Sequence, residues 1–287
     1  MNVLNPKLDF YLIKFPIFFP IIYFLILKFF PIYENHLIIF TILLLAEPHF
    51  GATWPFFLNK TNYNHINQNK LSLVILPIFL FLFCILFYFI ASKVFLLIFF
   101  AANIYHVTRQ SYGICKLYTK DSAELLYQEI GLYFFNFLFF LIGYLKFYLN
   151  IFQIYNLNLF LIISLILFSI YLLIYLIKYS FSENLFTTIS GIIIFLPICF
   201  VTNPVHAIIM GVTIHYSQYL AFTYKITQKR RYFKKKLNFN YRFIITVAIY
   251  SIIMTLLSLT KTFDQSILSS LIIIPISFQM LHFYLDS

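Results

Sequence analysis

Charge is scarce in this sequence of 287 residues, and that scarcity excludes most classes of protein. Only 10% of the residues are Asp, Glu, Lys or Arg, against roughly 25% in an average soluble domain. The 20 basic and 9 acidic side chains cannot form the polar surface that a soluble protein of this length needs. Soluble globular and disordered chains are therefore excluded.

Cysteine and glycine are also scarce. The three cysteines (Cys84, Cys115 and Cys199) lie in separate apolar stretches without CxxC spacing, so we interpret them as small buried hydrophobic residues rather than a disulfide scaffold. Only six residues are glycine, which argues against a transporter that rocks about broken helices.

Apolar residues make up 62% of the chain, aromatic residues 22%, and the mean hydropathy is +0.90. This composition predicts an all-α, polytopic transmembrane helical bundle, with residues 1–287 forming a single integral membrane domain. The apolar runs divide into about ten spans of roughly 20 residues. The predicted spans are 10–31, 36–58, 71–90, 93–117, 124–148, 157–178, 184–201, 203–226, 240–259 and 264–286.

The distribution of Lys and Arg predicts that both termini are cytoplasmic. With the N-terminus inside, 15 of the 20 basic residues lie on the inner side and 4 on the outer side, while Arg109 lies within a span. The most basic segment, 225–242, is then a cytoplasmic loop facing anionic lipid, and no nucleic-acid partner is expected. We expect the chain to lie in a bacterial inner membrane.

Four histidines lie in even-numbered spans: His49, His106, His215 and His282. The first three are about 9 to 11 residues from the inner ends of their spans, which places them at one depth of roughly 14–17 Å. Neutral imidazole is a common ligand of iron, copper and zinc, so the pattern predicts a shared metal site. Hydrogen bonding between helices is the alternative for each histidine.

Polar residues accompany these histidines at spacings that place them on the same helix face, where they would hold the second imidazole nitrogen. These supporting residues are Glu47, Arg109, Gln110, Gln218, Tyr219 and Asp286. No catalytic side chain beyond the metal centre is predicted. His206 lies nine residues before His215, so it faces the opposite side of the helix, about 13 Å further out. It follows a predicted helix start at Asn203 and Pro204.

The motif Pro48-His49-Phe50-Gly51-Ala52 resembles the Pro-His-Gly-Ala motif of the bacteriorhodopsin-related-protein/Blh-type family of bacterial carotenoid dioxygenases. His282 with Asp286 is similar to the family's final histidine, which an aspartate follows. The sequence departs from the family at Thr53, where an aspartate is usual, and at Tyr219, where a second histidine is usual. The resemblance implies a non-haem iron(II) held by four histidines, and a membrane-dissolved substrate such as β-carotene that is cleaved to retinal.

Other functions remain open from the sequence. A membrane transporter or lipid-handling protein would use the intramembrane His, Arg and Asp residues as a polar relay. A b-type cytochrome would bind haem between two of the histidines. A membrane desaturase would need clustered His boxes with about eight ligands, whereas this chain has 7 His in total and no such box. The oligomeric state is also open.

Overall fold

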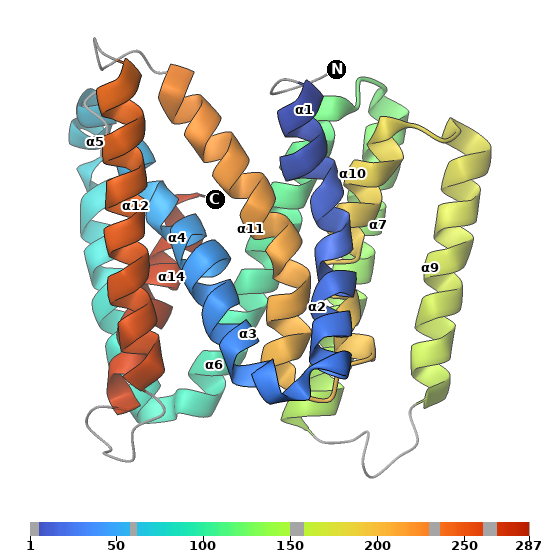
Figure 1. Ribbon diagram of the computed structural model, residues 1–287, viewed down its shortest axis with the longest axis horizontal. Helices are drawn as coiled ribbons and strands as arrows, with labels where there is room; N and C mark the ends of the chain where they lie inside the picture. Colours follow the sequence, from blue (N-terminus) through green and yellow to red (C-terminus); the bar gives the residue numbers. More distant parts are fainter. Residues whose placement is uncertain (1–5, 58–61, 150–157, 230–235, 261–268, 287) are drawn as a thin grey trace. The chain divides into compact units, whose positions relative to one another are not determined.

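The computed structural model describes residues 6–57, 62–149, 158–229, 236–260 and 269–286, and these form helices joined by short turns, with no strand among them (Figure 1). The predicted all-α class is confirmed. The chain divides into two compact units. The first unit comprises Met1–Glu34 and Ile104–Gln218, and the second comprises Asn35–Asn103 and Tyr219–Ser287.

Five helical segments are long and apolar enough to cross a membrane: Pro6–Phe29, Pro31–Pro55, Leu71–Tyr118, Ser122–Tyr148 and Leu159–Tyr179. Two shorter apolar helices, Phe243–Leu259 and Ser270–Leu285, are also present. These helices are compatible with an integral membrane protein. The count of ten spans and the cytoplasmic position of both termini stay predictions.

The first unit begins with a nearly continuous helical run built from α1 (Pro6–Asp9), η1 (Phe10–Lys14), η2 (Phe15–Phe18), α2 (Phe19–Phe29) and η3 (Pro31–Tyr33). It continues with the C-terminal part of α6 (Leu76–Tyr118), α7 (Ser122–Gly143), η7 (Tyr144–Tyr148) and α9 (Asn158–Tyr179). It closes with α10 (Glu183–Ile192), η8 (Leu196–Cys199) and the N-terminal part of α11 (Pro204–Lys229).

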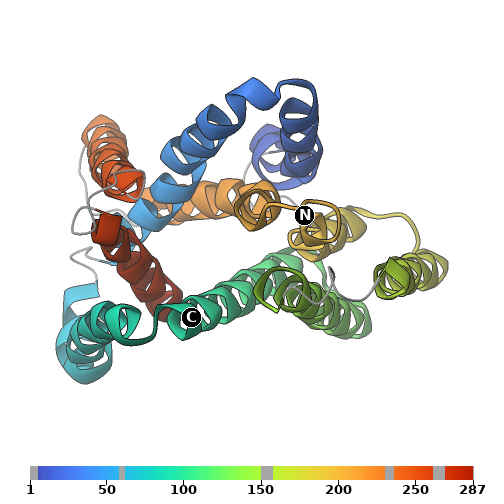
Figure 2. The ribbon, with the colours of Figure 1, turned by 90° about the horizontal axis from the view of Figure 1, so that it is seen from below.

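Close backbone packing and buried polar contacts hold the first unit together. A Cβ on Gly211 would lie 1.5 Å from the Ile194 carbonyl oxygen, so only glycine allows α11 to approach this backbone. Helix α9 lies beside α7 at the edge of the unit (Figures 1 and 2). The stacked rings of Tyr127 and Tyr171 join these two helices, and each hydroxyl donates to the other residue's carbonyl oxygen.

The outer side of α9 is apolar, which is the arrangement of a membrane helix. Its exposed large residues are Leu159, Ile162, Ile163, Ile166, Leu167, Ile170, Leu173, Ile174, Leu176 and Ile177. Its polar contacts instead point toward the unit, where Tyr175 is fully buried. A lipid environment favours apolar residues on the outer surface of a helical unit and polar residues in its interior.

The second unit contains α3 (Glu34–Thr41, whose first residue belongs to the first unit), η4 (Ile42–Ala46), α4 (Glu47–Phe57), α5 (Tyr63–Gln68), η6 (Leu71–Ile75) and the N-terminal part of α6. The C-terminal part of α11, α12 (Lys236–Leu259), η10 (Ser270–Ile272) and α14 (Ile273–Leu285) complete it. Helices α4, α12 and α14 pack against one another (Figure 2). The buried residues Ala52, Phe243 and Val247 form one of its apolar clusters.

Two local predictions from the sequence are confirmed. The break predicted near 91–93 is a kink at Ala91 inside α6, where the backbone is not helical (φ −146°, ψ 60°). Asn203 begins α11 as predicted, because its side-chain oxygen accepts a hydrogen bond from the Val205 amide at 2.9 Å and Pro204 is the first helical residue.

The predicted span 184–201 differs from the structure. Helix α10 ends at Ile192, the chain turns, and the short helix η8 follows. Pro197 explains the break, because a proline ring clashes with the carbonyl group four residues earlier in a continuing helix. This segment is therefore a short helix, a turn and a second short helix rather than one span.

Candidate metal centre

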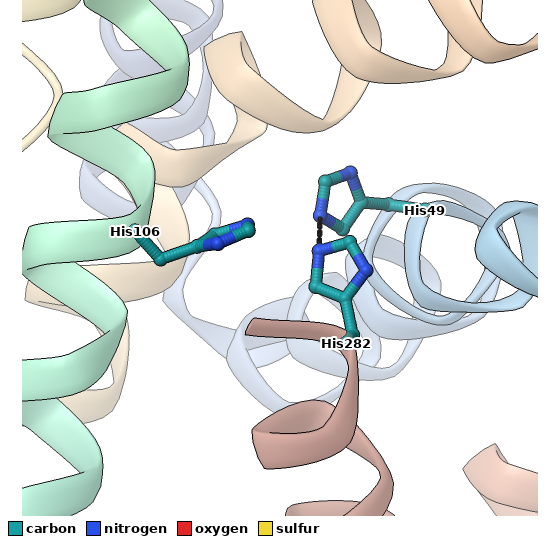
Figure 3. Close-up of side chains that lie close together, drawn as sticks. All are labelled: His49, His106 and His282. Carbon is teal, nitrogen blue, oxygen red and sulfur yellow. Dashed lines mark hydrogen bonds between the residues drawn. The ribbon is translucent and has the colours of Figure 1, made fainter. Parts of the chain in front are cut away.

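Two buried histidines face one another in the second unit. His49 lies on α4 and His282 on α14, and their Nε2 atoms are 2.9 Å apart (Figure 3). Both side chains are almost completely buried, with exposed fractions of 0% and 1%. Two neutral imidazoles in this arrangement share one proton between the two Nε2 atoms, and a cation could take the place of that proton.

The other nitrogen of His282 is held by oxygen atoms. Its Nδ1 lies 2.7 Å from the Thr53 hydroxyl and 3.3 Å from the Asp286 carboxylate, one helical turn along α14. A proton on Nδ1 satisfies both oxygens and directs the Nε2 lone pair toward His49. Tyr219 completes this network, because its hydroxyl donates to Asp286 and lies 3.0 Å from the Thr53 hydroxyl.

The donor set fits a transition metal. Imidazole nitrogens bind such ions at about 2.0–2.1 Å, so two ligands at a right angle lie about 3.0 Å apart. The observed Nε2–Nε2 distance of 2.9 Å matches this spacing. The carboxylate and hydroxyl at Nδ1 of His282 are the partners that typically orient a metal-bound imidazole.

The first unit holds the other two predicted ligands. His106 on α6 and His215 on α11 are both buried, and their ring centroids are 5.9 Å apart with the rings nearly perpendicular. The four predicted ligands therefore form one pair in each unit.

The predicted supporting residues behave differently from one another. Asp286 contacts His282, whereas Tyr219, which we expected beside His215, contacts His282 and Asp286. Gln218, however, donates its hydrogen bonds to the Ile13 carbonyl at 2.9 Å and to the Ser190 hydroxyl at 3.3 Å, and not to His215. That carbonyl belongs to η1.

Arg109, Gln110 and Glu47 are not seen to hold an imidazole within the part of the chain that the structure describes. Arg109 lies on the exposed face of α6, whereas His106 is buried. The spacing of three residues therefore did not place Arg109 beside the His106 ring. Gln110 is half-buried. Glu47 is buried at the start of α4, where its carboxyl lies beside Gln279 of α14.

His206 has its own partners. It is completely buried, and its Nδ1 lies 2.8 Å from the Tyr23 hydroxyl while its Nε2 lies 2.6 Å from the Glu34 carboxylate. Both contacts lie within the first unit. The structure therefore gives His206 a structural role in linking Tyr23 of α2 and Glu34 to α11.

Thr53 is the contact that the sequence analysis missed. It was noted only as a departure from the family motif, yet its hydroxyl lies 2.7 Å from Nδ1 of His282. Thr53 follows His49 by four residues, so the same spacing rule that selected Gln110 and Asp286 would have selected it. Comparisons of the chain with protein-family models, curated proteins and solved structures give no match.

Proposed function

We propose that this protein is a membrane-embedded non-haem iron oxygenase that cleaves a carotenoid-like polyene, with β-carotene to retinal as the model reaction. His49, His106, His215 and His282 supply the ligands. The observation that carries this proposal is the buried Nε2–Nε2 contact between His49 and His282 at the spacing of two metal ligands. The cellular location that we propose is a bacterial inner membrane.

The ligand chemistry favours iron, copper or zinc over magnesium or calcium, because the donors are imidazoles and not a set of carboxylates. An iron(II) ion bound by these side chains would supply the activation of dioxygen that cleavage of a carbon–carbon double bond requires. Both oxygen atoms of dioxygen end in the two carbonyl products, so the reaction needs no further reductant and no net proton.

The residues around the pair would orient the ligands and exclude water. Thr53 and Asp286 fix the ring of His282, and Tyr219 links these two oxygens. Aromatic rings then enclose the imidazoles on other sides: Phe50 lies 5.2 Å and Phe283 lies 5.8 Å from the His282 ring, measured between centroids. Such an apolar wall suits a polyene that enters from the bilayer.

The test is the iron content of the detergent-purified protein, measured by elemental mass spectrometry with an optical spectrum of the same sample. We expect about one iron per chain without a Soret band, and formation of an aldehyde from β-carotene. Replacing His49, His106, His215 or His282 with alanine should lower the bound iron and abolish turnover. The exposed residues His36 and His65 are the matched controls, and their alanine variants should retain both properties.

Three outcomes would overturn the proposal. Normal iron in three of the four ligand variants would reject the ligand set. A Soret band would indicate haem instead of non-haem iron. No transition metal after anaerobic loading with iron would favour a transporter or lipid-handling protein, in which the same histidines serve as a polar relay.

A further inference from the structure

We propose that the exposed face of α6 and α7 in the first unit is the interface of a two-fold symmetric dimer of this chain. This inference depends on the membrane location but not on the metal or the reaction. It starts from a group of exposed and half-buried polar residues on membrane-spanning segments. We call this group the arginine–tyrosine patch, and it consists of Tyr105, Arg109, Tyr112, Lys116, Glu129 and Tyr133.

The patch is a continuous surface within the first unit. The ring centroids of Tyr105 and Tyr112 lie 6.4 Å and 6.5 Å from that of Tyr133. The Tyr112 hydroxyl lies beside the Glu129 carboxylate, and Tyr133 lies near both Glu129 and Arg109. Opposite charges therefore occupy adjacent positions on two neighbouring helices.

Lipid is a poor environment for Arg109. The residue lies two turns before Lys116, which places it about 10 Å from Lys116 and about 13 Å from the end of the segment at Tyr118, at 1.5 Å per residue. Side chains in a helix tilt toward its N-terminus, which in α6 leads away from the Lys116 end and from the nearer membrane surface. An arginine facing hydrocarbon is costly, and such residues normally face protein or a water-filled cavity.

Among the described residues, no carboxylate oxygen lies within 4.0 Å of an Arg109 nitrogen. A second copy of the chain supplies a carboxylate partner. A two-fold axis along the membrane normal keeps every residue of the second copy at the same membrane depth as in the first. The contacts through Tyr112 and Tyr133 place Arg109 and Glu129 within about one helical turn of each other in depth. Arg109 of each copy then pairs with Glu129 of the other copy.

Gly113 provides the space for this contact. It is exposed, lies one turn after Arg109 on the same face of α6, and has nothing within 4 Å of the position that a Cβ would occupy. Small residues on exposed faces of membrane helices allow a second helix to approach closely. The charge pattern and the small residue therefore favour the same occupant, a second copy of this chain.

The first experiment is oxidative crosslinking of the full chain in lipid nanodiscs. We expect Gly113→Cys to give a covalent dimer, because the native cysteines are all buried in the structure. The control is Leu173→Cys on α9, which is 58% exposed but outside the patch and should stay monomeric. Equal crosslinking of the two variants would overturn the proposal.

The second experiment exchanges the charges. Arg109→Glu places like charges opposite each other and should raise the dissociation constant of the dimer about ten-fold or more, measured by mass photometry at several dilutions. The double variant Arg109→Glu/Glu129→Arg should restore the dimer, and Lys178→Gln on α9 should leave it unchanged. A wild-type monomer would overturn the proposal. So would an Arg109→Glu variant that dimerises normally but copurifies with less anionic lipid, because the patch would then bind a headgroup.

Discussion

One buried polar site of the first unit and one of the second are built in opposite ways. In the first unit, the buried Glu124 carboxylate accepts a hydrogen bond from Tyr175 at 2.5 Å and two from Asn184 at 3.1 Å each, so the protein itself satisfies this charge. In the second unit, the buried imidazoles of His49 and His282 direct their Nε2 atoms toward each other. Satisfied networks stabilise a fold, whereas two converging ligand atoms are the arrangement that a metal ion would use.

Backbone packing shows a similar difference, because the tightest glycine in each unit contacts a different kind of atom. Gly211 in the first unit lies against the Ile194 carbonyl, which belongs to the backbone and cannot rotate away. Gly51 in the second unit lies against the Tyr250 ring, at 2.8 Å from the position of a Cβ. A side-chain ring can shift by a few tenths of an ångström at moderate cost.

The largest effect that we predict is therefore that of Gly211→Ala. The new methyl group should separate α11 from the Ile194 segment and destabilise the protein by about 4 kcal/mol or more, so that little folded protein accumulates. Fluorescence-detected size-exclusion chromatography of the detergent extract would measure this. The control Gly143→Ala, whose Cβ would lie 3.3 Å from a side-chain methyl of Ile198, should fold normally. Gly51→Ala should fall between the two.

The next effect separates a structural histidine from the proposed ligands. His206→Leu should destabilise the protein by about 3 kcal/mol, because it leaves the buried Tyr23 hydroxyl and the Glu34 carboxylate without their shared partner. Iron content per folded chain should stay at the wild-type value. Tyr23→Phe, which removes only one of the two contacts, should cost about 1 kcal/mol. Thermal unfolding and elemental analysis of the same samples would check this, and loss of iron in His206→Leu would contradict the distinction.

A smaller effect is expected from the hydroxyl that orients His282. Thr53→Val keeps the shape of the side chain but removes its contact with Nδ1, so the affinity for iron should fall about 10–100-fold while the fold is retained. Competition with a chelator measures this affinity. Thr41→Val in the same unit is the matched control, since among the described residues the Thr41 hydroxyl bonds to the Leu37 carbonyl of its own helix alone. Equal affinities of the two variants would exclude an orienting role for Thr53.

These residues also show what the sequence could predict. The start of α11 at Asn203 and the kink at Ala91 follow from local chemistry, and both were predicted. The location of each histidine within an even-numbered apolar span was enough to select His49 and His282, which the structure brings together across 233 positions of the chain.

The errors have one cause in common, which is that spacing along a helix does not determine which of its faces is covered. Arg109 has the right spacing from His106 but lies on the exposed side of α6, and Gln218 bonds to a carbonyl of η1 instead of to His215. The break after Ile192 was missed for a similar reason, because the apolar run around Pro197 resembles a span by composition alone. Tertiary contacts decide each of these cases.

The smallest effect concerns the ion pair of the first unit, between Lys14 and the exposed end of α10. The Lys14 ammonium donates to the Glu183 carboxylate at 2.7 Å and holds the pKa of that carboxyl below its usual value of 4.5. A carboxyl whose pKa is lower in the folded state stabilises the protein above the pKa of the unfolded state, and this contribution disappears as the pH falls through the folded value. Glu183 is 55% exposed, so solvent screening limits the contribution to less than about 1 kcal/mol. Melting curves of the wild type and Glu183→Gln should therefore differ slightly at pH 7 and converge as the pH is lowered stepwise toward 3, whereas a difference that persists at low pH would assign the effect to packing instead of charge.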